Sequence, residues 1–177
     1  IAELVARGAT VEEMSKVTMI TPLFLEAIKR IVDKETELKN NVNNADVLIS
    51  AKKLGFSDKY VAKMWNTTEK EIAAFRKAHG IRPIFKMVDT LHSGAYIPYF
   101  YSTYTGNKDE SIITDKKKII VLGAGPIRIG QGVEFDYSTV HAVTTIKKSG
   151  YEAIIINNNP ETVSTDYTTS DKLYFEP

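Results

Sequence analysis

Hydrophobic residues in the first part of the chain recur at the spacing of amphipathic helices. Behind Thr21 and Pro22, the apolar residues Leu25, Ile28 and Val32 follow at intervals of three and four positions. Proline costs no hydrogen bond at the first helical position, because an N–H there would have no partner within the helix. The pattern predicts a helix that buries one side only.

Residues that cap backbone N–H groups mark further helix starts. Thr10 and Thr68 each precede a glutamate by three positions, which is the capping-box pattern, and Asn44 and Ser57 are single caps. Such short helices are marginal in isolation, so we expect them to pack together. The expected core residues are Leu48, Leu54, Phe56, Val61, Met64, Trp65, Ile72 and Phe75.

A different pattern appears in the last third of the chain. Residues 118–122 and 153–156 are short apolar runs, and 172–175 begins a third. Continuous apolar runs of this length are typical of buried parallel strands. A glycine-rich turn and a predicted helix at 134–148 lie between the first two runs, so the sequence predicts a βαβ unit.

The predicted boundary between these two patterns lies at 106/107. In residues 82–106 the periodicity gives way to Pro, Gly and aromatic residues. We interpret them as an extended connector whose rings pack on a neighbouring surface, with stacking on a ligand as the alternative. The predicted fold class is therefore a small helical domain with its connector (1–106), followed by a truncated Rossmann-like α/β unit (107–177).

The composition indicates an ordinary globular chain without a strong overall charge. Of 177 residues, 43% are hydrophobic, and 23 basic residues balance 22 acidic ones. The net charge of +1 provides no general attraction for nucleic acid or for anionic membranes. The chain has no Cys, which excludes disulfides and fits a reducing cytoplasm. No apolar run approaches the roughly 20 residues of a membrane helix, so we expect a cytoplasmic chain.

A glycine-rich segment follows the first predicted strand. Gly123, Gly125 and Gly130 would let backbone N–H groups approach an anion, although a tight turn that only packs the helix on the strand is an equal alternative. The dinucleotide fingerprint is not met, because Arg128 occupies the position of its third glycine. The phosphate loop of Walker-type NTPases is not met either, because Gln131 stands where that loop has Lys.

Polar and charged residues gather where the first two predicted strands end. In open α/β sheets, ligands bind at this edge. Each residue alone could form a surface ion pair or a helix cap, but their clustering on adjacent loops favours a binding site. The candidates are Arg128, Gln131, Glu134 and Asp136 after the first strand, and Asn157, Asn159, Glu161 and Thr162 after the second.

Two other kinds of site have weaker support. His79, His92 and His141 lie in separate segments without further ligands at metal-binding spacing, so we predict no metal site. Residues 53–72 have the cadence of a DNA-binding helix-turn-helix. The charges of its would-be recognition helix, residues 68–79, nearly cancel, whereas phosphate contact requires a basic face. We therefore expect no nucleic-acid partner, and keep a helix-turn-helix or a pure assembly module as the alternative function.

Three longer runs of residues are more specific than any of these patterns. They are GAGPIRIGQGVEFDY at 123–137, NNNPETVSTDY at 157–167 and SDKLYFEP at 170–177. Together they resemble the large subunit of glutamine-dependent carbamoyl phosphate synthetases, at the opening of its second, carbamoyl-phosphate-forming half.

The helical part of the chain resembles the oligomerisation domain of the same family. The similar stretches are FLEAI at 24–28, KLGFSD at 53–58 and FKMVDT at 85–90. The resemblance therefore covers almost the whole chain. It implies an internal fragment of an ATP-dependent ligase, made of the oligomerisation domain and the pre-ATP-grasp unit that opens the second half.

The resemblance also implies a reaction. The family makes carbamoyl phosphate from bicarbonate, ammonia released by a glutaminase small subunit, and two ATP, for arginine or pyrimidine synthesis. ATP and Mg2+ (or Mn2+) are held in ATP-grasp domains of the full-length enzyme. We therefore expect the fragment to have no catalytic residue and no bound cofactor of its own, and to be inactive alone. Its expected contributions are self-association through the helical domain and part of a carbamate tunnel.

Four residues are implied at the end of this tunnel. Arg128, Gly132, Glu134 and Glu161 occupy the motif positions that line it in the family. Carbamate decomposes readily in water, so a route shielded from solvent and lined by polar groups is preferable to open diffusion. We expect the residues of the glycine loop to lie beside this route.

Overall fold

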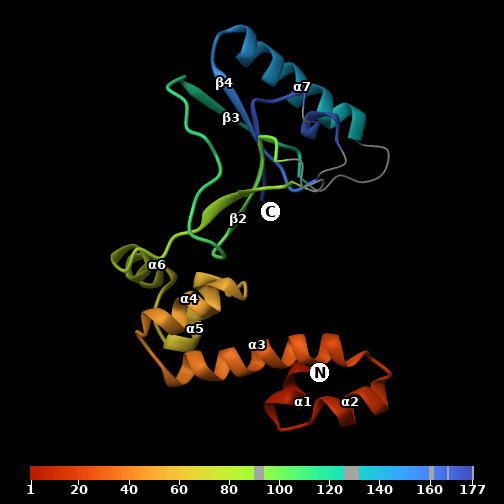
Figure 1. The fold of residues 1–177 in the computed structure, drawn as a ribbon, viewed down its shortest axis with the longest axis vertical. Helices are drawn as coiled ribbons and strands as arrows, with labels where there is room; N and C mark the ends of the chain where they lie inside the picture. Colours follow the sequence, from red (N-terminus) through yellow and green to blue (C-terminus); the bar gives the residue numbers. More distant parts are fainter. Residues whose placement is uncertain (90–93, 126–131, 160–161, 167, 177) are drawn as a thin grey trace. The chain divides into compact units, whose positions relative to one another are not determined.

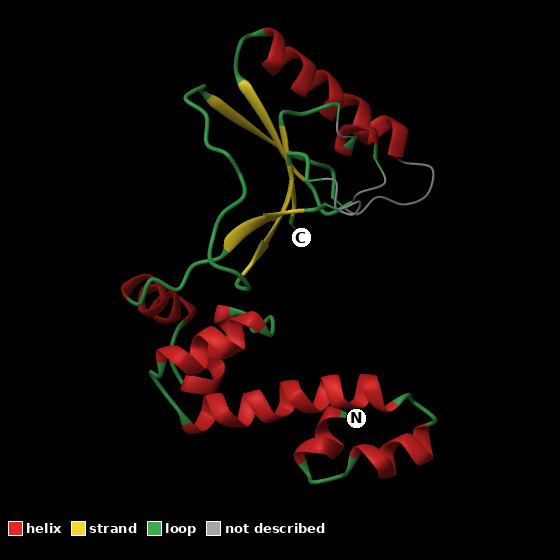
Figure 2. Ribbon diagram, viewed as in Figure 1, coloured by secondary structure: helices red, strands yellow, loops and turns green. Residues whose placement is uncertain are grey.

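The computed structural model describes residues 1–89, 94–125, 132–159, 162–166 and 168–176; of 132–135 it describes the backbone only. The chain divides into two compact units, Ile1–Arg82 and Pro83–Pro177 (Figure 1). The first unit is helical, and the second contains a sheet with a long helix (Figure 2). The predicted fold class, a helical domain followed by a Rossmann-like α/β unit, is confirmed.

The helices of the first unit begin where the capping residues predict. Thr10 forms the expected capping box, in which its hydroxyl accepts from Glu13 N at 3.2 Å and the Glu13 carboxylate accepts from Thr10 N at 3.0 Å. Thr68 forms the same box with Glu71. The six helices are α1 (Ala2–Ala6), α2 (Val11–Thr18), α3 (Pro22–Asn40), α4 (Ala45–Lys53), α5 (Asp58–Trp65) and α6 (Glu69–Ala78).

Two groups of side chains form the interior of the helical unit. Val5, Met14 and Leu25 pack together and join α1, α2 and α3. Toward the other end of α3, the buried indole of Trp65 donates its Nε1–H to the carbonyl of Leu38 at 2.9 Å. This bond satisfies the polar atom of Trp65 while the ring fills the core.

Most of the expected core residues of this unit are inside. Leu48, Phe56, Val61, Trp65 and Ile72 are buried, and Met64 and Phe75 are half-buried. The expectation is wrong for Leu54, which is 42% exposed. The reason is that α4 ends at Lys53, so Leu54 caps the helix and leaves its buried face.

A buried ion network ties α4, α5 and α6 together. The Asp58 carboxylate accepts from Lys52 Nζ at 2.9 Å and from Arg76 Nη2 at 2.6 Å. Burial raises the pKa of the Asp58 carboxyl, but the hydrogen bonds from Arg76 and Lys52 outweigh it, and the pKa lies below its ordinary value. The carboxylate is therefore stabilised in its charged form.

The second unit is built on a five-stranded sheet of order β1-β2-β5-β4-β3. Strands β2, β5, β4 and β3 are parallel, and β1 pairs antiparallel with β2 at the edge. The elements are β1 (Ile84–Met87), β2 (Tyr99–Thr103), β3 (Lys118–Leu122), α7 (Gly132–Lys148), β4 (Glu152–Ile156), the 3-10 helix η1 (Val163–Thr165) and β5 (Lys172–Phe175).

The segment interpreted as a connector is part of this sheet, which corrects the predicted boundary at 106/107. Residues 84–87 form β1 and 99–103 form β2, and β2 pairs with β5 from the far end of the chain. The compact units accordingly separate at Arg82/Pro83. The pairing of β2 with β5 depends on residues far apart in the sequence, so the local pattern of residues 82–106 does not predict it. The predicted packing of the aromatic rings is observed, because Phe100 is buried beside Tyr174.

The two faces of the sheet differ in their cover. Helix α7 packs on β3 and β4, where Val143 joins Ala153, Ile155 and Leu173 in a buried cluster. Figure 2 shows α7 lying along this side. On the opposite face, where no described helix packs, a hollow is lined by apolar side chains that include Phe85, Ile120, Ile154, Ile156 and Tyr174.

A second buried ion pair lies at the amino-terminal ends of β4 and β5. Lys172 Nζ is 2.9 Å from Glu152 Oε1, and both side chains are almost fully buried. Burial raises the pKa of the Glu152 carboxyl. Hydrogen bonds from Thr114 and Lys172 lower this pKa by a larger amount, so that it lies below its ordinary value. This pair is at the end of the sheet opposite to the predicted site.

Candidate functional site

The predicted site is at the carboxyl ends of three adjacent parallel strands. Gly123 follows β3, Asn157 follows β4 and Glu176 follows β5. The backbone of Gly123 donates to the Ile156 carbonyl at 2.8 Å, and that of Asn157 donates to the Tyr174 carbonyl at 3.0 Å. The three strand ends are thus held side by side, as the sequence predicts for this edge of the sheet.

Gly123 and Asn157 approach one another closely. A Cβ atom on Gly123 would lie only 2.5 Å from Cγ of Asn157. Any larger residue at 123 would therefore displace the Asn157 side chain. Gly125 is required for another reason, because its φ of +71° is in the left-handed region that favours glycine.

Asp136 anchors α7 to the segment that follows β4. It is 3% exposed, and its Oδ2 accepts from the backbone N–H of Ser164 in η1 at 2.6 Å. This bond favours a structural role for Asp136 over a role in binding, because the Asp136 carboxylate holds the loop that contains Ser164. Such a charge-assisted bond is stronger than one between neutral groups.

The predicted candidate Thr162 belongs to a cluster of hydroxyl groups around η1, whose other members, Ser164 and Thr165, were not predicted. The Thr162 hydroxyl lies 3.2 Å from that of Thr165, whose backbone carbonyl accepts from the Tyr99 hydroxyl of β2. Ser164 is fully buried next to them. The sequence signal was the run of small polar residues directly after a buried strand, and the structure shows that these residues pack rather than reach into solvent.

The structure describes only some of the predicted site residues. Gly132 is the first residue of α7, and the backbone of Glu134 is in the first turn of the same helix. Since α7 connects β3 to β4, that turn is at the carboxyl edge of the sheet. The side chain of Glu134, and Arg128, Gly130, Gln131 and Glu161 altogether, lie outside the described residues.

A site for Mg2+ does not emerge from the residues that are described. Among them, no three His, Asp or Glu side chains are grouped so that they could hold a metal ion. The described carboxylates at this edge are already hydrogen-bonded within the protein, that of Asp136 to the Ser164 N–H and that of Glu176 to the Ser102 N–H.

The helical unit carries a second candidate site, an apolar surface that we call the α3 strip. It starts at the end of α2, where Val17 in the last turn and the C-cap Met19 are 84% and 86% exposed. It continues along α3 through Phe24 and Ile31, which are seven positions apart and therefore on one side of the helix. The described members of the strip are Val17, Met19, Leu23, Phe24 and Ile31.

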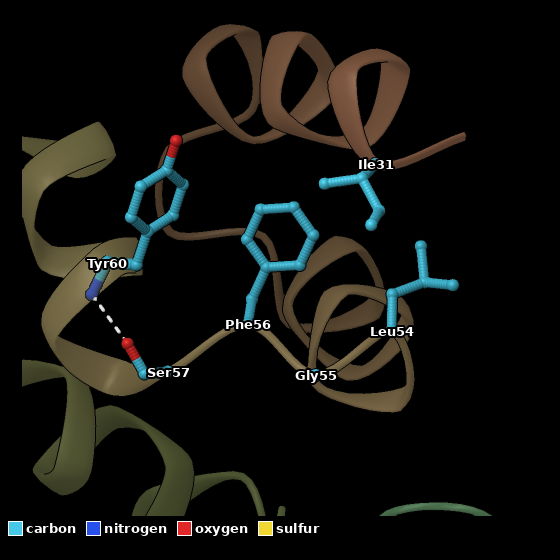
Figure 3. Close-up of a pocket in the computed structure, with 6 residues that line it drawn as sticks. All are labelled: Ile31, Leu54, Gly55, Phe56, Ser57 and Tyr60. Carbon is cyan, nitrogen blue, oxygen red and sulfur yellow. Dashed lines mark hydrogen bonds between the residues drawn. The ribbon is translucent and has the colours of Figure 1, made fainter. Parts of the chain in front are cut away.

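The α3 strip ends in a groove between α3 and the turn from α4 to α5 (Figure 3). Ile31 and Leu54 line one end of it, and the rings of Phe56 and Tyr60 line the other. The Tyr60 ring is held in place because its hydroxyl donates to Glu35 Oε2 at 2.9 Å. Exposed apolar surface of this extent is characteristic of protein interfaces.

No helix in the described residues has the length and apolar character that crossing a membrane requires.

Comparison with protein families identifies both units. Residues 1–80 match the carbamoyl-phosphate synthetase large chain oligomerisation domain. Residues 115–177 match the carbamoyl phosphate synthase preATP-grasp domain. Both domains come from one enzyme, and together the matches span most of the helical unit and the β3-to-β5 part of the sheet. The chain therefore belongs to the carbamoyl phosphate synthase large-chain family.

Proposed function

We propose that the protein to which this chain belongs makes carbamoyl phosphate from bicarbonate, glutamine-derived ammonia and two ATP, for arginine or pyrimidine synthesis. The observation that carries the proposal is the match of both units to domains of one large chain. In this proposal a glutaminase small subunit supplies the ammonia. The nucleotides and Mg2+ (or Mn2+) are bound by ATP-grasp domains, which supply phosphoryl transfer when present.

The α/β unit, in this proposal, forms part of the carbamate tunnel. The residues assigned to it are Arg128, Gly132, Glu134 and Glu161. The position of Gly132 supports the assignment, because it begins α7 at the same carboxyl edge of the sheet at which Gly123 and Asn157 pack closely. A protected passage keeps carbamate from decomposing in water before it is phosphorylated.

A bulky side chain at the start of α7 tests the tunnel. In the full-length enzyme, Gly132→Phe should lower carbamoyl phosphate formation while glutaminase activity is retained, because only passage of carbamate is obstructed. The matched control is Thr145→Phe, which adds the same ring at an exposed position of the same helix. Unchanged synthesis by Gly132→Phe would contradict the placement of the tunnel.

The 177-residue chain alone should be inactive. It is expected to form no carbamoyl phosphate from bicarbonate, ammonia and ATP, because the ATP-grasp domains are absent from both matches. The measurement is ATP-dependent product formation by the purified chain, with full-length enzyme as the positive control. Product from the chain alone would overturn this part of the proposal.

The helical unit supports self-association, and the α3 strip is the surface that we assign to it. Burying its exposed apolar side chains against a second copy would remove them from water, which stabilises a complex by about 25 cal/mol for each Å2. The family match to an oligomerisation domain favours a second copy of the same chain as the partner.

Charges placed on the strip should separate the copies. Leu23→Glu combined with Phe24→Glu leaves α3 intact, because acidic residues are favourable in the first turn of a helix. Arg30→Glu is the matched control, since it changes the net charge equally at an exposed position of α3. Sedimentation of the chain should show smaller species for the double variant only.

The helix-turn-helix alternative makes the opposite prediction. Its would-be recognition helix is α6, where the Arg76 guanidinium is already paired with Asp58 and donates to the Ile81 carbonyl. Paired in this way, Arg76 is poorly suited to contact phosphates. A strict monomer that binds DNA tightly at physiological salt would favour this alternative over self-association.

A further inference from the structure

The side-chain amide of Asn157 is the most unusual polar group of the α/β unit. Asn157 is 3% exposed, and among the described residues its Nδ2 has no hydrogen-bond partner. Its Oδ1 accepts a long bond from the backbone of Asn159, at 3.4 Å. Buried side-chain donors are nearly always paired, and leaving one unpaired costs about 1–3 kcal/mol.

The alternation of side chains along β4 shows which face of the sheet Asn157 occupies. Ile155 is in the cluster beneath α7, and Ile156 lines the hollow on the opposite face. Successive residues of a strand point to opposite faces, so Asn157 is on the α7 side. It is therefore at the strand end from which the chain leads into α7.

The side-chain amide of Asn157 fits at this position because residue 123 is glycine. A Cβ atom there would be 2.7 Å from Asn157 Nδ2. The φ of Gly123 is not in the left-handed region, so this glycine is not required by backbone conformation. The fit of the two residues thus places a buried N–H donor at the carboxyl edge of the sheet.

The surroundings favour an anionic oxygen as the partner of this donor. The amino terminus of α7 carries a partial positive charge and lies at this edge. The nearest described carboxylate of α7, that of Asp136, is already paired with the Ser164 N–H and buried. The arrangement offers an N–H donor to a small planar carboxylate-type anion.

We propose that Asn157 Nδ2 donates a hydrogen bond to an oxygen of carbamate as it reaches the second half of the enzyme. This inference rests on the proposed function and adds a residue to its tunnel. Asn157 orients the anion and gives its oxygen a partner in place of water. Gly123 acts through Asn157, as a positioning residue that leaves room for the Asn157 amide.

The decisive variant is Asn157→Asp in the full-length enzyme. It keeps the size of the side chain and its Oδ1 acceptor, but replaces the donor with an acidic oxygen that repels an anion. Hydrogen bonds to charged groups are worth enough to predict that carbamoyl phosphate formation falls by about tenfold or more. Carbamate that is not retained decomposes, so the ATP hydrolysed per carbamoyl phosphate formed should rise.

The ratio of ATP to product separates a contact with carbamate from a structural role. A variant that only destabilises the fold would lower ATP hydrolysis and product formation together and leave the ratio unchanged. Asn158→Asp is the matched control, because it makes the same change at the neighbouring, exposed position. An unchanged ratio in Asn157→Asp, or an equal rise in both variants, would overturn the inference.

A stability measurement tests the unpaired donor without any activity. Asn157→Leu removes the amide while keeping the branching of the side chain at Cγ, and the chain should then be at least as resistant to thermal unfolding as the original. A clear loss of stability would mean that Nδ2 has a partner within the protein, which would contradict the inference. Failure of the unmodified full-length enzyme to make carbamoyl phosphate would instead overturn the proposed function.

Discussion

The two units of this chain are held together in different ways. In the helical unit, each helix packs on one that is next or next but one in the sequence, and capping residues such as Thr10 and Thr68 define where helices start. In the α/β unit, β2 pairs with β5, although Tyr99 and its partner Leu173 are far apart in the sequence. The Glu176 carboxylate reinforces the same link by accepting from Ser102 N at 2.7 Å. Local signals thus specify the first unit, and distant pairing completes the second.

Both units also contain a buried ion pair, and here too the arrangement differs. Asp58 connects three helices through two cations, whereas Glu152 and Lys172 join neighbouring strands. Removing one member of a buried pair leaves an uncompensated charge, which is much more costly than losing an exposed pair. The comparison therefore predicts that each unit can be destabilised separately.

The largest expected effect is in the helical unit. Asp58→Asn leaves the buried Lys52 ammonium without its countercharge and should lower the free energy of unfolding of this unit by about 3–5 kcal/mol. The only tryptophan of the chain, Trp65, is in this unit, so its fluorescence reports the transition. Urea unfolding followed at this residue gives the change directly.

An exposed ion pair in α3 provides the control for that variant. Asp33→Asn removes the same charge from a pair with Lys29 and should cost at most about 1 kcal/mol. Equal losses in Asp58→Asn and Asp33→Asn would show that the buried network does not stabilise the helical unit as described.

A smaller effect is expected in the α/β unit. Gly123→Ala places a Cβ atom 2.5 Å from Asn157 Cγ and should destabilise this unit by about 1–3 kcal/mol. The unfolding midpoint measured by Trp65 fluorescence should stay the same, while the loss of sheet signal in circular dichroism moves to lower urea concentration. Asn157 Cβ would also lie 2.7 Å from the added atom, so the rescue background is Asn157→Gly, in which most of this cost should disappear. An undiminished cost there would contradict the steric explanation.

The smallest effect concerns a helix cap. Thr68→Ala removes the hydroxyl that accepts from Glu71 N and should cost about 1 kcal/mol, again measured through Trp65. Thr36→Ala is a suitable comparison, because its hydroxyl bonds only a carbonyl of its own helix, which contributes little to stability. A Thr36→Ala loss as large as that of Thr68→Ala would argue against a special role for the cap.

Much of the fold could be predicted because its signals are local. The helix starts at Thr10, Asn44, Ser57 and Thr68 are as predicted, since a capping side chain acts within three residues. The apolar run at 118–122 forms a strand as predicted, but its expected burial is wrong, because β3 is at the edge of the sheet and Ile120 and Leu122 are 56% and 75% exposed. The helix predicted at 134–148 begins two residues earlier, at Gly132, because the backbone is already helical ahead of Glu134.

The candidate site was predictable in position but not in detail. An α/β sheet binds ligands at the carboxyl ends of its strands, so Asn157 is a candidate because it follows a predicted strand, whereas Gly123 is one because it opens the glycine-rich segment. Their mutual fit, and the unpaired Nδ2 that it leaves, depend on the register of β3 and β4. The packing role of Asp136 likewise depends on where η1 lies.

The sequence by itself determined the local elements, the apolar runs that become strands and the motifs that place the chain in its family. The tertiary structure alone decided that residues 84–87 and 99–103 belong to the sheet, that Leu54 faces a groove, and that Asn157 and Gly123 meet. The physical reason is the separation in the sequence over which each kind of interaction acts. Capping and periodicity act within a few residues, whereas strand order and close packing arise only when distant segments bury their surfaces together.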